Sequence, residues 1–428
     1  MYAAVTLFST FASTAWLSLA SRFFGALSVY LLHAGKNDER VVTGASEGKK
    51  GKKGKKGEKQ YEFPSLAVVK LSRAASYEIK HFSTFDQSVT LLFGIGTNCV
   101  ATFALSSVMD TRNTMLPGMC VVSFLLCIYN TLNTVFLDQT TSKYERYGLI
   151  LLFFLGVGST YWLLLYKSDL VLHTTLEDSV TKTLAAFSEI LKKREVFTGL
   201  DATKVKIPNH LTATLISVLA GYVSACVFSS ALRITQSYNM SIATSQADFH
   251  WGAKYLKRRG SLQVVWHTAM VAPLLLACMG PSDGKGAMYA AAVMFVVVAH
   301  LAIIRPMLQA FLDRGLVEWY ETKHSTDNAE TLSALAKYLK SALQRRLYVL
   351  GKVSVQGITL PLLLISLVPL NLSLLNRGGE VDVPTGAANL PGQFIWELVA
   401  SYLLWWGSCN WSVIFLVALY LRRAGVFR

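Results

Sequence analysis

The feature that most constrains the fold is a series of apolar blocks, each about as long as a bilayer-crossing helix. Such a helix needs about 20 apolar residues, because each residue advances it by about 1.5 Å. The chain also has a mean hydropathy of +0.39 and 16% charged residues, against about 25% in soluble domains. We therefore expect an all-α, polytopic transmembrane helix bundle of about nine spans, and we exclude a purely soluble enzyme. The nine blocks are Ala3–Ala20, Val89–Val108, Met115–Phe136, Tyr147–Tyr166, Leu211–Leu232, Ser261–Met279, Gly286–Ile304, Leu347–Leu370 and Leu398–Leu421.

The distribution of basic residues between the blocks predicts the orientation. If every block crosses once and residues 21–87 are cytosolic, the cytosolic segments hold 30 Lys and Arg residues and the outside segments hold 10. Cytosolic loops of membrane proteins carry such an excess of Lys and Arg. We therefore expect the N-terminus outside or in a lumen and the C-terminus in the cytosol.

The first apolar block has two interpretations. A cleaved signal peptide begins with basic residues, but residues 1–6 contain none, and the first positive charge, Arg22, follows the apolar block. This order favours a retained signal anchor. We divide the chain into an anchor and interfacial segment (1–33), a basic and partly disordered cytosolic arm (34–87) and a transmembrane helical bundle (88–428).

The basic arm contains the repeat GKKGKKGKKGEK at residues 48–59. Glycine at every third position opposes helix formation, and the lysines repel one another, so we expect disorder. A soluble linker that enforces topology is one interpretation. The other is attraction to anionic lipids of the inner leaflet, which are candidate partners of the arm. The candidate lipid-binding residues are Lys49, Lys50, Lys52, Lys53, Lys55, Lys56 and Lys59.

A second cytosolic segment, residues 327–347, has the pattern of an amphipathic surface helix. Asp327 and Glu330 form a capping box, and leucines recur behind them at helical spacing. We expect this helix to lie in the membrane interface or to pack on the cytosolic ends of the bundle.

Arginine and glutamine recur together at two predicted cytosolic boundaries. Arg233 with Gln236 follows the fifth block, and Arg305 with Gln309 follows the seventh. A guanidinium there can bind a lipid phosphate bidentately or pair with an acid such as Asp313 or Asp248, or it can serve only as a topology anchor.

Other polar residues fall within the predicted spans, where an ionisable group is costly. His267 and His300 are expected at similar depth, either as a proton-responsive or ligand-binding pair or as two neutral imidazoles bonded to neighbouring groups. Lys352 is expected to snorkel to the cytosolic surface. Asn410, among three tryptophans in the last span, needs a hydrogen-bond partner and indicates helix packing or a lined cavity.

Motifs of catalysis are absent from the sequence. It contains no glycine-rich phosphate loop, no HExxH, no GxSxG and no Cys/His metal spacing, and all six cysteines fall inside predicted spans. We expect no catalytic residues, no metal, no cofactor and no nucleic-acid partner.

Several stretches, taken together, resemble the transmembrane protein 161 family. They are the N-terminal apolar segment with a Lys-rich arm, Leu232-Arg233…Gln236, His267 with Ala272-Pro273-Leu274, Arg305…Leu308-Gln309-Ala310-Phe311-Leu312, and Leu404-Trp405-Trp406 with Cys409. The chain departs from animal members in being shorter and in its regular GKK arm. The resemblance implies a polytopic protein without an established enzymatic activity, associated with the regulation of ion currents and with stress responses.

Two function hypotheses follow. The first is a non-enzymatic multi-pass membrane protein that scaffolds or modulates other membrane components and regulates ion currents. The second is a channel or transporter with a pathway formed by the last five spans. An intramembrane enzyme that uses the two histidines is a third and weaker hypothesis.

Overall fold

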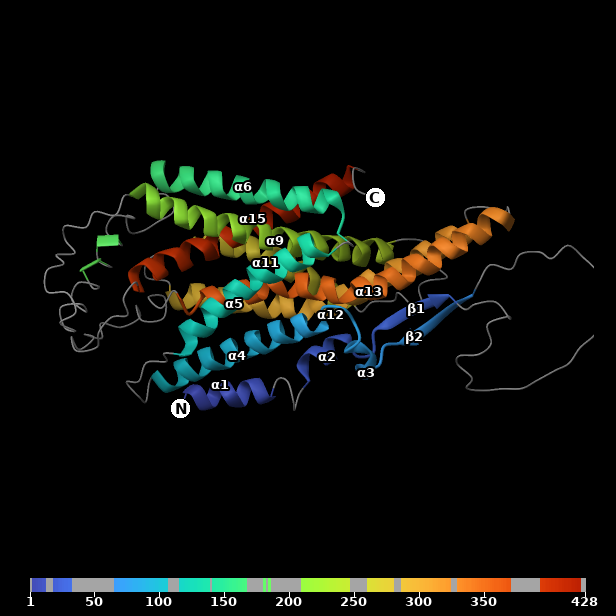
Figure 1. The fold of residues 1–428 in the computed structure, drawn as a ribbon, viewed down its shortest axis with the longest axis horizontal. Helices are drawn as coiled ribbons and strands as arrows, with labels where there is room; N and C mark the ends of the chain where they lie inside the picture. The colour runs from blue at the N-terminus through green and yellow to red at the C-terminus, as the bar shows by residue number, and fades with distance from the viewer. Residues whose placement is uncertain are drawn as a thin grey trace, which may run out of the picture.

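The protein is an all-α helical bundle with one short two-stranded sheet (Figure 1), as the apolar blocks predict. The structure is a computed structural model, and it describes residues 2–12, 18–32, 65–106, 115–138, 141–167, 180–181, 184–185, 209–246, 260–280, 286–324, 329–370 and 393–424. The lysines of residues 48–59, the capping residue Asp327 and the candidate acid partner Asp248 lie outside these ranges.

The elements follow one another along the chain in an almost uninterrupted series of helices. They are α1 (Tyr2–Phe11), α2 (Leu19–Phe24), β1 (Ser28–Leu32), β2 (Leu66–Lys70), α3 (Arg73–Ser76), α4 (Phe82–Ser106), α5 (Met115–Leu132) with a π-helical turn (Asn133–Leu137), α6 (Lys143–Tyr166), α9 (Asn209–Gln246), α11 (Gly260–Met279), α12 (Gly286–His324), α13 (Ala329–Leu367) and α15 (Gln393–Arg423).

Seven of the helices in the described part of the chain are long and apolar enough to cross a membrane: α5, α6, α9, α11, α12, α13 and α15. Each coincides with one of the predicted blocks. The other two blocks are not among them, so the count of nine is not confirmed. In the first of these blocks α1 has ten residues, about 15 Å of helix. In the second, α4 has 25 residues and begins seven residues before the predicted start at Val89.

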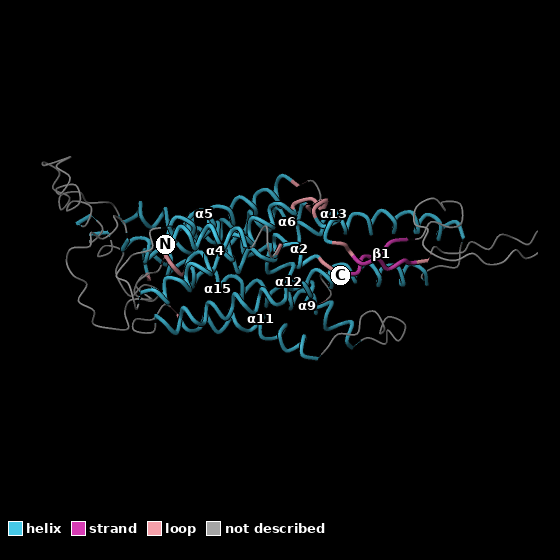
Figure 2. The backbone as a smooth tube through the Cα atoms, turned by 90° about the horizontal axis from the view of Figure 1, so that it is seen from below, coloured by secondary structure: helices cyan, strands magenta, loops and turns pink. Residues whose placement is uncertain are grey.

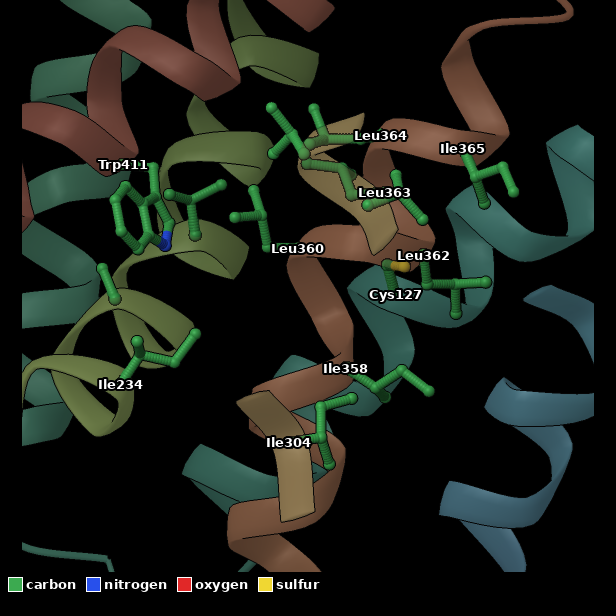
Figure 3. Close-up of a cluster of buried hydrophobic side chains, with 14 of the residues drawn as sticks. Cys127, Ile234, Ile304, Ile358, Leu360, Leu362, Leu363, Leu364, Ile365 and Trp411 are labelled. Carbon is green, nitrogen blue, oxygen red and sulfur yellow. The ribbon is translucent and has the colours of Figure 1, made fainter. Parts of the chain in front are cut away.

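Helix α13 lies at the centre of the bundle and packs against α4, α5, α9, α12 and α15. Nearly all of its most apolar window is buried, 94%, whereas α6 on the periphery buries 22% of its own. Figure 3 shows Ile358, Leu360 and Leu362–Ile365 of this helix among Cys127, Ile234, Ile304 and Trp411 from four neighbouring helices. Close apolar packing around α13 therefore holds the bundle together.

Three helices run well past the predicted membrane boundary. Helices α9, α12 and α13 have 38, 39 and 39 residues, or about 57–58 Å each, whereas the hydrocarbon core is about 30 Å thick. The predicted amphipathic helix at 327–347 is consequently not a separate surface element, because it is continuous with the eighth predicted span in α13. Its apolar face, with Leu339 and Leu343 buried, packs on α12, and Leu343 lies against Gly315.

The short sheet is an element that the sequence analysis did not predict. Strands β1 and β2 are rich in β-branched and apolar residues, and they pair antiparallel from Ser28 opposite Lys70 to Leu32 opposite Leu66. Figures 1 and 2 both place the sheet beside the extended ends of α12 and α13, and Val29 and Tyr30 are buried there. The described part of the predicted basic arm, residues 65–87, is thus folded: it forms β2, α3 and the start of α4.

The six cysteines are all free and lie in helices α4, α5, α9, α11 and α15, as their positions within the apolar blocks predict. The thiol of Cys226 in α9 lies 3.7 Å from the Cys127 carbonyl oxygen of α5, and the thiol of Cys127 lies 3.9 Å from the Thr359 carbonyl oxygen of α13. They contribute to packing as small apolar side chains.

Candidate functional site: a buried charged cluster and its cavity

The centre of the candidate site is Glu145, a buried acid at the start of α6. The hydroxyl of Ser142 caps this helix by accepting from the Glu145 backbone N–H at 3.2 Å. The cap fixes the first turn, and the Glu145 carboxylate points into the bundle. It accepts a hydrogen bond from Arg233 Nη2 at 2.8 Å and another from Gln356 Nε2 at 3.2 Å.

Arg233 completes a ring of contacts between three helices. Its Nε donates to Gln356 Oε1 at 2.9 Å and its Nη1 donates to Gln236 Oε1 at 3.3 Å. The side chains of Arg233 and Glu145 are only 16% and 6% exposed. A buried ion pair is tolerated when further hydrogen bonds satisfy both charges, and here both glutamines do so. The ring therefore ties α6, α9 and α13 together at one level of the bundle.

Lys352 lies one helical turn before Gln356 and is 1% exposed. The prediction that it snorkels to the surface is wrong, because its ammonium group stays inside and donates to the Thr141 hydroxyl. That hydroxyl donates in turn to the Thr134 carbonyl at 3.1 Å. The turn between α5 and α6 folds over the end of Lys352 and supplies a polar partner there.

Asp138, in the same turn, holds the segment that precedes α4. Lys80 Nζ lies 3.2 Å from one oxygen of Asp138, and His81 Nε2 lies 3.5 Å from the other. The hydroxyl of Tyr348 and the Asp138 carboxylate raise the pKa of Lys80, while burial and then the charge of Lys80 lower the pKa of His81. His81 takes a left-handed backbone conformation, with φ of 67°.

Arg305 and Gln309 serve a different purpose from Arg233 and Gln236. Gln309 accepts from the Ser28 backbone N–H at 2.9 Å and donates to Asp313 at 2.6 Å, and the Tyr30 hydroxyl donates to Asp313 at 2.9 Å. Arg305 is exposed and donates to the Gly25 carbonyl at 3.0 Å. This group joins α12 to β1 and to the turn before it. The proposed pairing of Arg305 with Asp313 is replaced by one between Gln309 and Asp313.

A cavity of about 350 Å³ lies beside the ring, between the extended parts of α9, α12 and α13. Five cationic side chains and one acid contribute to its lining. They are Arg233, Arg314, Arg345, Arg346, Lys352 and Glu318. Two other cavities, of about 200 and 100 Å³, are lined almost entirely by apolar side chains of α5, α6, α9, α13 and α15.

The two histidines of the spans are not brought together. His300 is 1% exposed, and its Nδ1 lies 2.9 Å from the Val296 carbonyl oxygen, with its ring edge-on to Trp411. His267 is exposed, and its Nδ1 lies 2.6 Å from the Gln263 carbonyl oxygen. Each imidazole bonds the carbonyl four residues earlier, and the buried Nε2 of His300 makes no hydrogen bond to any described residue.

The polar centre of α15 serves helix packing. Asn410 donates to the Trp406 carbonyl of its own helix at 2.8 Å. Trp405 Nε1 reaches the Ala277 carbonyl of α11 at 3.1 Å, and Trp406 Nε1 reaches the Ser224 hydroxyl of α9 at 3.0 Å. Trp405 and Trp406 thus find partners on neighbouring helices, whereas the buried Nε1 of Trp411 makes no hydrogen bond to any described residue.

Sequence reasoning identified Arg233 and Gln236 but missed Glu145, Asp138, Gln356 and the cavity. A signal was present in α13, where Lys352 and Gln356 stand one helical turn apart within an apolar block, which places both on one face. No comparable signal pointed to Glu145, which resembles an ordinary loop acid until α6 and α9 pack together.

The described residues contain no group of three or more His, Cys, Asp or Glu side chains that could hold a metal ion. The chain matches no protein-family model, no curated protein and no solved structure. The conclusion that the geometry carries is therefore structural: this is a helical, multi-pass membrane protein with a buried charged ring and a cationic cavity at one end of its bundle.

Proposed function

We propose that the protein is a non-enzymatic membrane protein that scaffolds or modulates other membrane components, with the regulation of ion currents as its outcome. The observation that carries this proposal is the packing of α13, whose apolar window is 94% buried. A bundle closed around its central helix leaves its outer helices, such as α6, free to contact neighbouring proteins in the bilayer. The resemblance to the transmembrane protein 161 family supports the same function.

The orientation that we propose places the charged ring and the cavity in the cytosolic half. The 30-to-10 distribution of Lys and Arg supports it. In Figure 1 α1 begins at one end of the bundle, and α15 ends toward the other, which is the end that also carries the sheet and the extended helices. This arrangement fits an odd number of crossings, as nine spans require.

The alternative is a channel or transporter whose pathway runs through the last five spans. The cationic cavity is the observation in its favour. Against it, the buried section of α13 beyond Gln356 is surrounded by apolar side chains, and the cavity bordered by Leu367 and Leu370 near the other end of this helix is apolar. A pathway would need polar groups along this section.

Flux measurements on the purified protein distinguish the two functions. The full chain, reconstituted in liposomes with a potassium or chloride gradient, is expected to give no more flux than protein-free liposomes. In cells, its expression is expected to change the amplitude of endogenous currents without changing their reversal potentials. The scaffold proposal would be overturned if the purified protein gave flux and this flux stopped when Lys352 was replaced by Met. That result would establish the channel or transporter.

A further inference from the structure

The cavity between α9, α12 and α13 has the charge of an anion-binding site. Arg233 and Lys352 form its floor near the buried ring, and Arg314, Arg345 and Arg346 form its wall. Glu318 is the one acid among the lining residues. The five cations are opposed by Glu318 and by Glu145, the partner of Arg233, so an excess of three positive charges remains around the cavity.

Two arginines of this wall have unused hydrogen-bonding capacity. The Nε of Arg346 is buried and makes no hydrogen bond to any described residue, although its two terminal nitrogens reach Glu318 and the Phe311 carbonyl. Arg345 is exposed and has no described partner. An unpaired buried guanidinium donor is unfavourable, and an acceptor in the cavity would remove that cost.

The size and donor set of the cavity match a phosphate-bearing anion. A volume of about 350 Å³ exceeds that of a single phosphate and lies at the lower end of the range for small-molecule sites, about 300–1,000 Å³. Arginine forks bind phosphate oxygens bidentately, and the side chains of Gln236 and Ser237 add an amide and a hydroxyl to the same lining.

The position of the cavity brings it to the level of lipid headgroups. Its floor residues, Arg233 and Lys352, lie within six residues of the predicted boundaries at Leu232 and Leu347, and its wall continues outward along α12 and α13. Apolar side chains of Phe311 and Val349 contribute to the lining beside the arginines. This combination of cations and apolar groups suits a headgroup that is still attached to its acyl chains.

We propose that this cavity binds a polyphosphorylated anion of the inositol phosphate class, either as a phosphoinositide headgroup or as the free inositol phosphate. The site is independent of the scaffold function, since it requires only the described residues of α9, α12 and α13. Binding would neutralise the arginine wall and join the three extended helices.

The test measures binding by the purified full chain in detergent. The probes are short-chain phosphatidylinositol 4,5-bisphosphate, inositol 1,4,5-trisphosphate and inorganic phosphate. Arg345→Gln removes an exposed cation that makes no described contact, so the fold is expected to be kept while the affinity falls about tenfold, the loss of one charge-assisted contact. Ala342→Phe fills the cavity without changing its charge and is expected to abolish binding.

The matched control is Lys340→Gln, which removes the same charge from an exposed position of α13 that does not line the cavity. Its affinity is expected to stay within twofold of the parent. Any one of three results would overturn the proposal. They are equal losses of affinity in Lys340→Gln and Arg345→Gln, binding that survives Ala342→Phe, and no binding of either inositol probe. Tight binding of inositol trisphosphate identifies the free anion as the ligand, and binding of the lipid alone identifies the headgroup.

Discussion

Arg233 and Arg305 have almost the same sequence context, because each follows an apolar block and has a Gln within one helical turn. Their environments nevertheless differ. Arg233 contacts Glu145, Gln236 and Gln356, whereas Arg305 is exposed and reaches one backbone carbonyl. The acid partner of Arg233 is 88 positions away, so only the packing of α6 on α9 creates the pair. Local pattern identified the residue but could not identify its partner.

This difference predicts that replacement by lysine lowers the stability of the protein at Arg233 and leaves it unchanged at Arg305. Arg233→Lys keeps the charge but loses the fork that reaches both glutamines, and we expect it to lower the free energy of unfolding by about 2 kcal/mol. Arg305→Lys is the matched control and is expected to leave stability unchanged. Thermal unfolding of the purified protein in detergent measures both variants. Equal stability of the two would show that the ring contributes nothing beyond charge.

His81 predicts a dependence of stability on pH. Its pKa lies below the ordinary value of 6.5, because burial and the charge of Lys80 disfavour the protonated ring, with Lys352 adding to this effect and Asp138 opposing it. The unfolded chain therefore binds the proton more tightly. The stability contributed by neutral His81 is complete above pH 6.5 and is lost as the pH falls from there toward the lowered pKa.

The measurement compares melting temperatures between about pH 7.5 and about pH 5.5. Asparagine tolerates the left-handed backbone at this position, so His81→Asn is expected to keep the fold and to reduce the acid-induced loss. His324→Asn, at an exposed position, is expected to leave the profile of the parent unchanged. An unaltered profile in His81→Asn would remove His81 as the origin of the effect.

At the scale of elements, hydropathy located seven helices correctly but misplaced the ends of three of them. The predicted spans end at Leu232 and Ile304, which a charged residue follows, and begin at Leu347, which a charged residue precedes. Arg233 and Arg346 bond to groups of neighbouring helices, and Arg305 bonds to the Gly25 carbonyl in the turn before β1, so the helices have no reason to stop there. The sheet was missed for a related reason: its two short strands are separated by 33 residues of sequence and become visible only when paired.

The close contact between α13 and the segment before α4 depends on Gly351. A Cβ atom at this position would lie 1.9 Å from the Lys80 carbonyl oxygen, which is backbone and cannot rotate away. Gly351→Ala is therefore expected to lower the free energy of unfolding by about 1–3 kcal/mol. Gly158→Ala, where a Cβ meets nothing within 4 Å, is the control and is expected to stabilise by up to about 1 kcal/mol. Chemical denaturation compares them, and equal effects would contradict the close contact.

At the scale of the whole molecule, the bundle has two unlike ends. One end carries the charged ring, the cationic cavity, the sheet and the extended helices α9, α12 and α13. The uneven distribution of Lys and Arg between the predicted loops indicates two unlike sides of the bundle. It could not indicate that these residues gather around one cavity, because they come from segments more than 100 positions apart, from Arg233 to Lys352.

The central claim is that the bundle crosses the membrane with this charged end in the cytosol, and labelling of single introduced cysteines tests it most directly. Lys340→Cys lies on the extended part of α13, and Lys167→Cys lies at the end of α6, on the side predicted to be outside. A membrane-impermeant maleimide distinguishes the two sides when it is added to intact cells and to cells in which only the plasma membrane has been opened. The parent chain measures the background reaction of the native cysteines. We expect Lys340→Cys to be unreactive in intact cells and to react as soon as the plasma membrane is opened. We expect Lys167→Cys either to react already in intact cells or, if it faces a lumen, to react only after all membranes are solubilised. The reverse pattern, or the same change in reactivity for both cysteines across intact, opened and solubilised cells, would contradict the account.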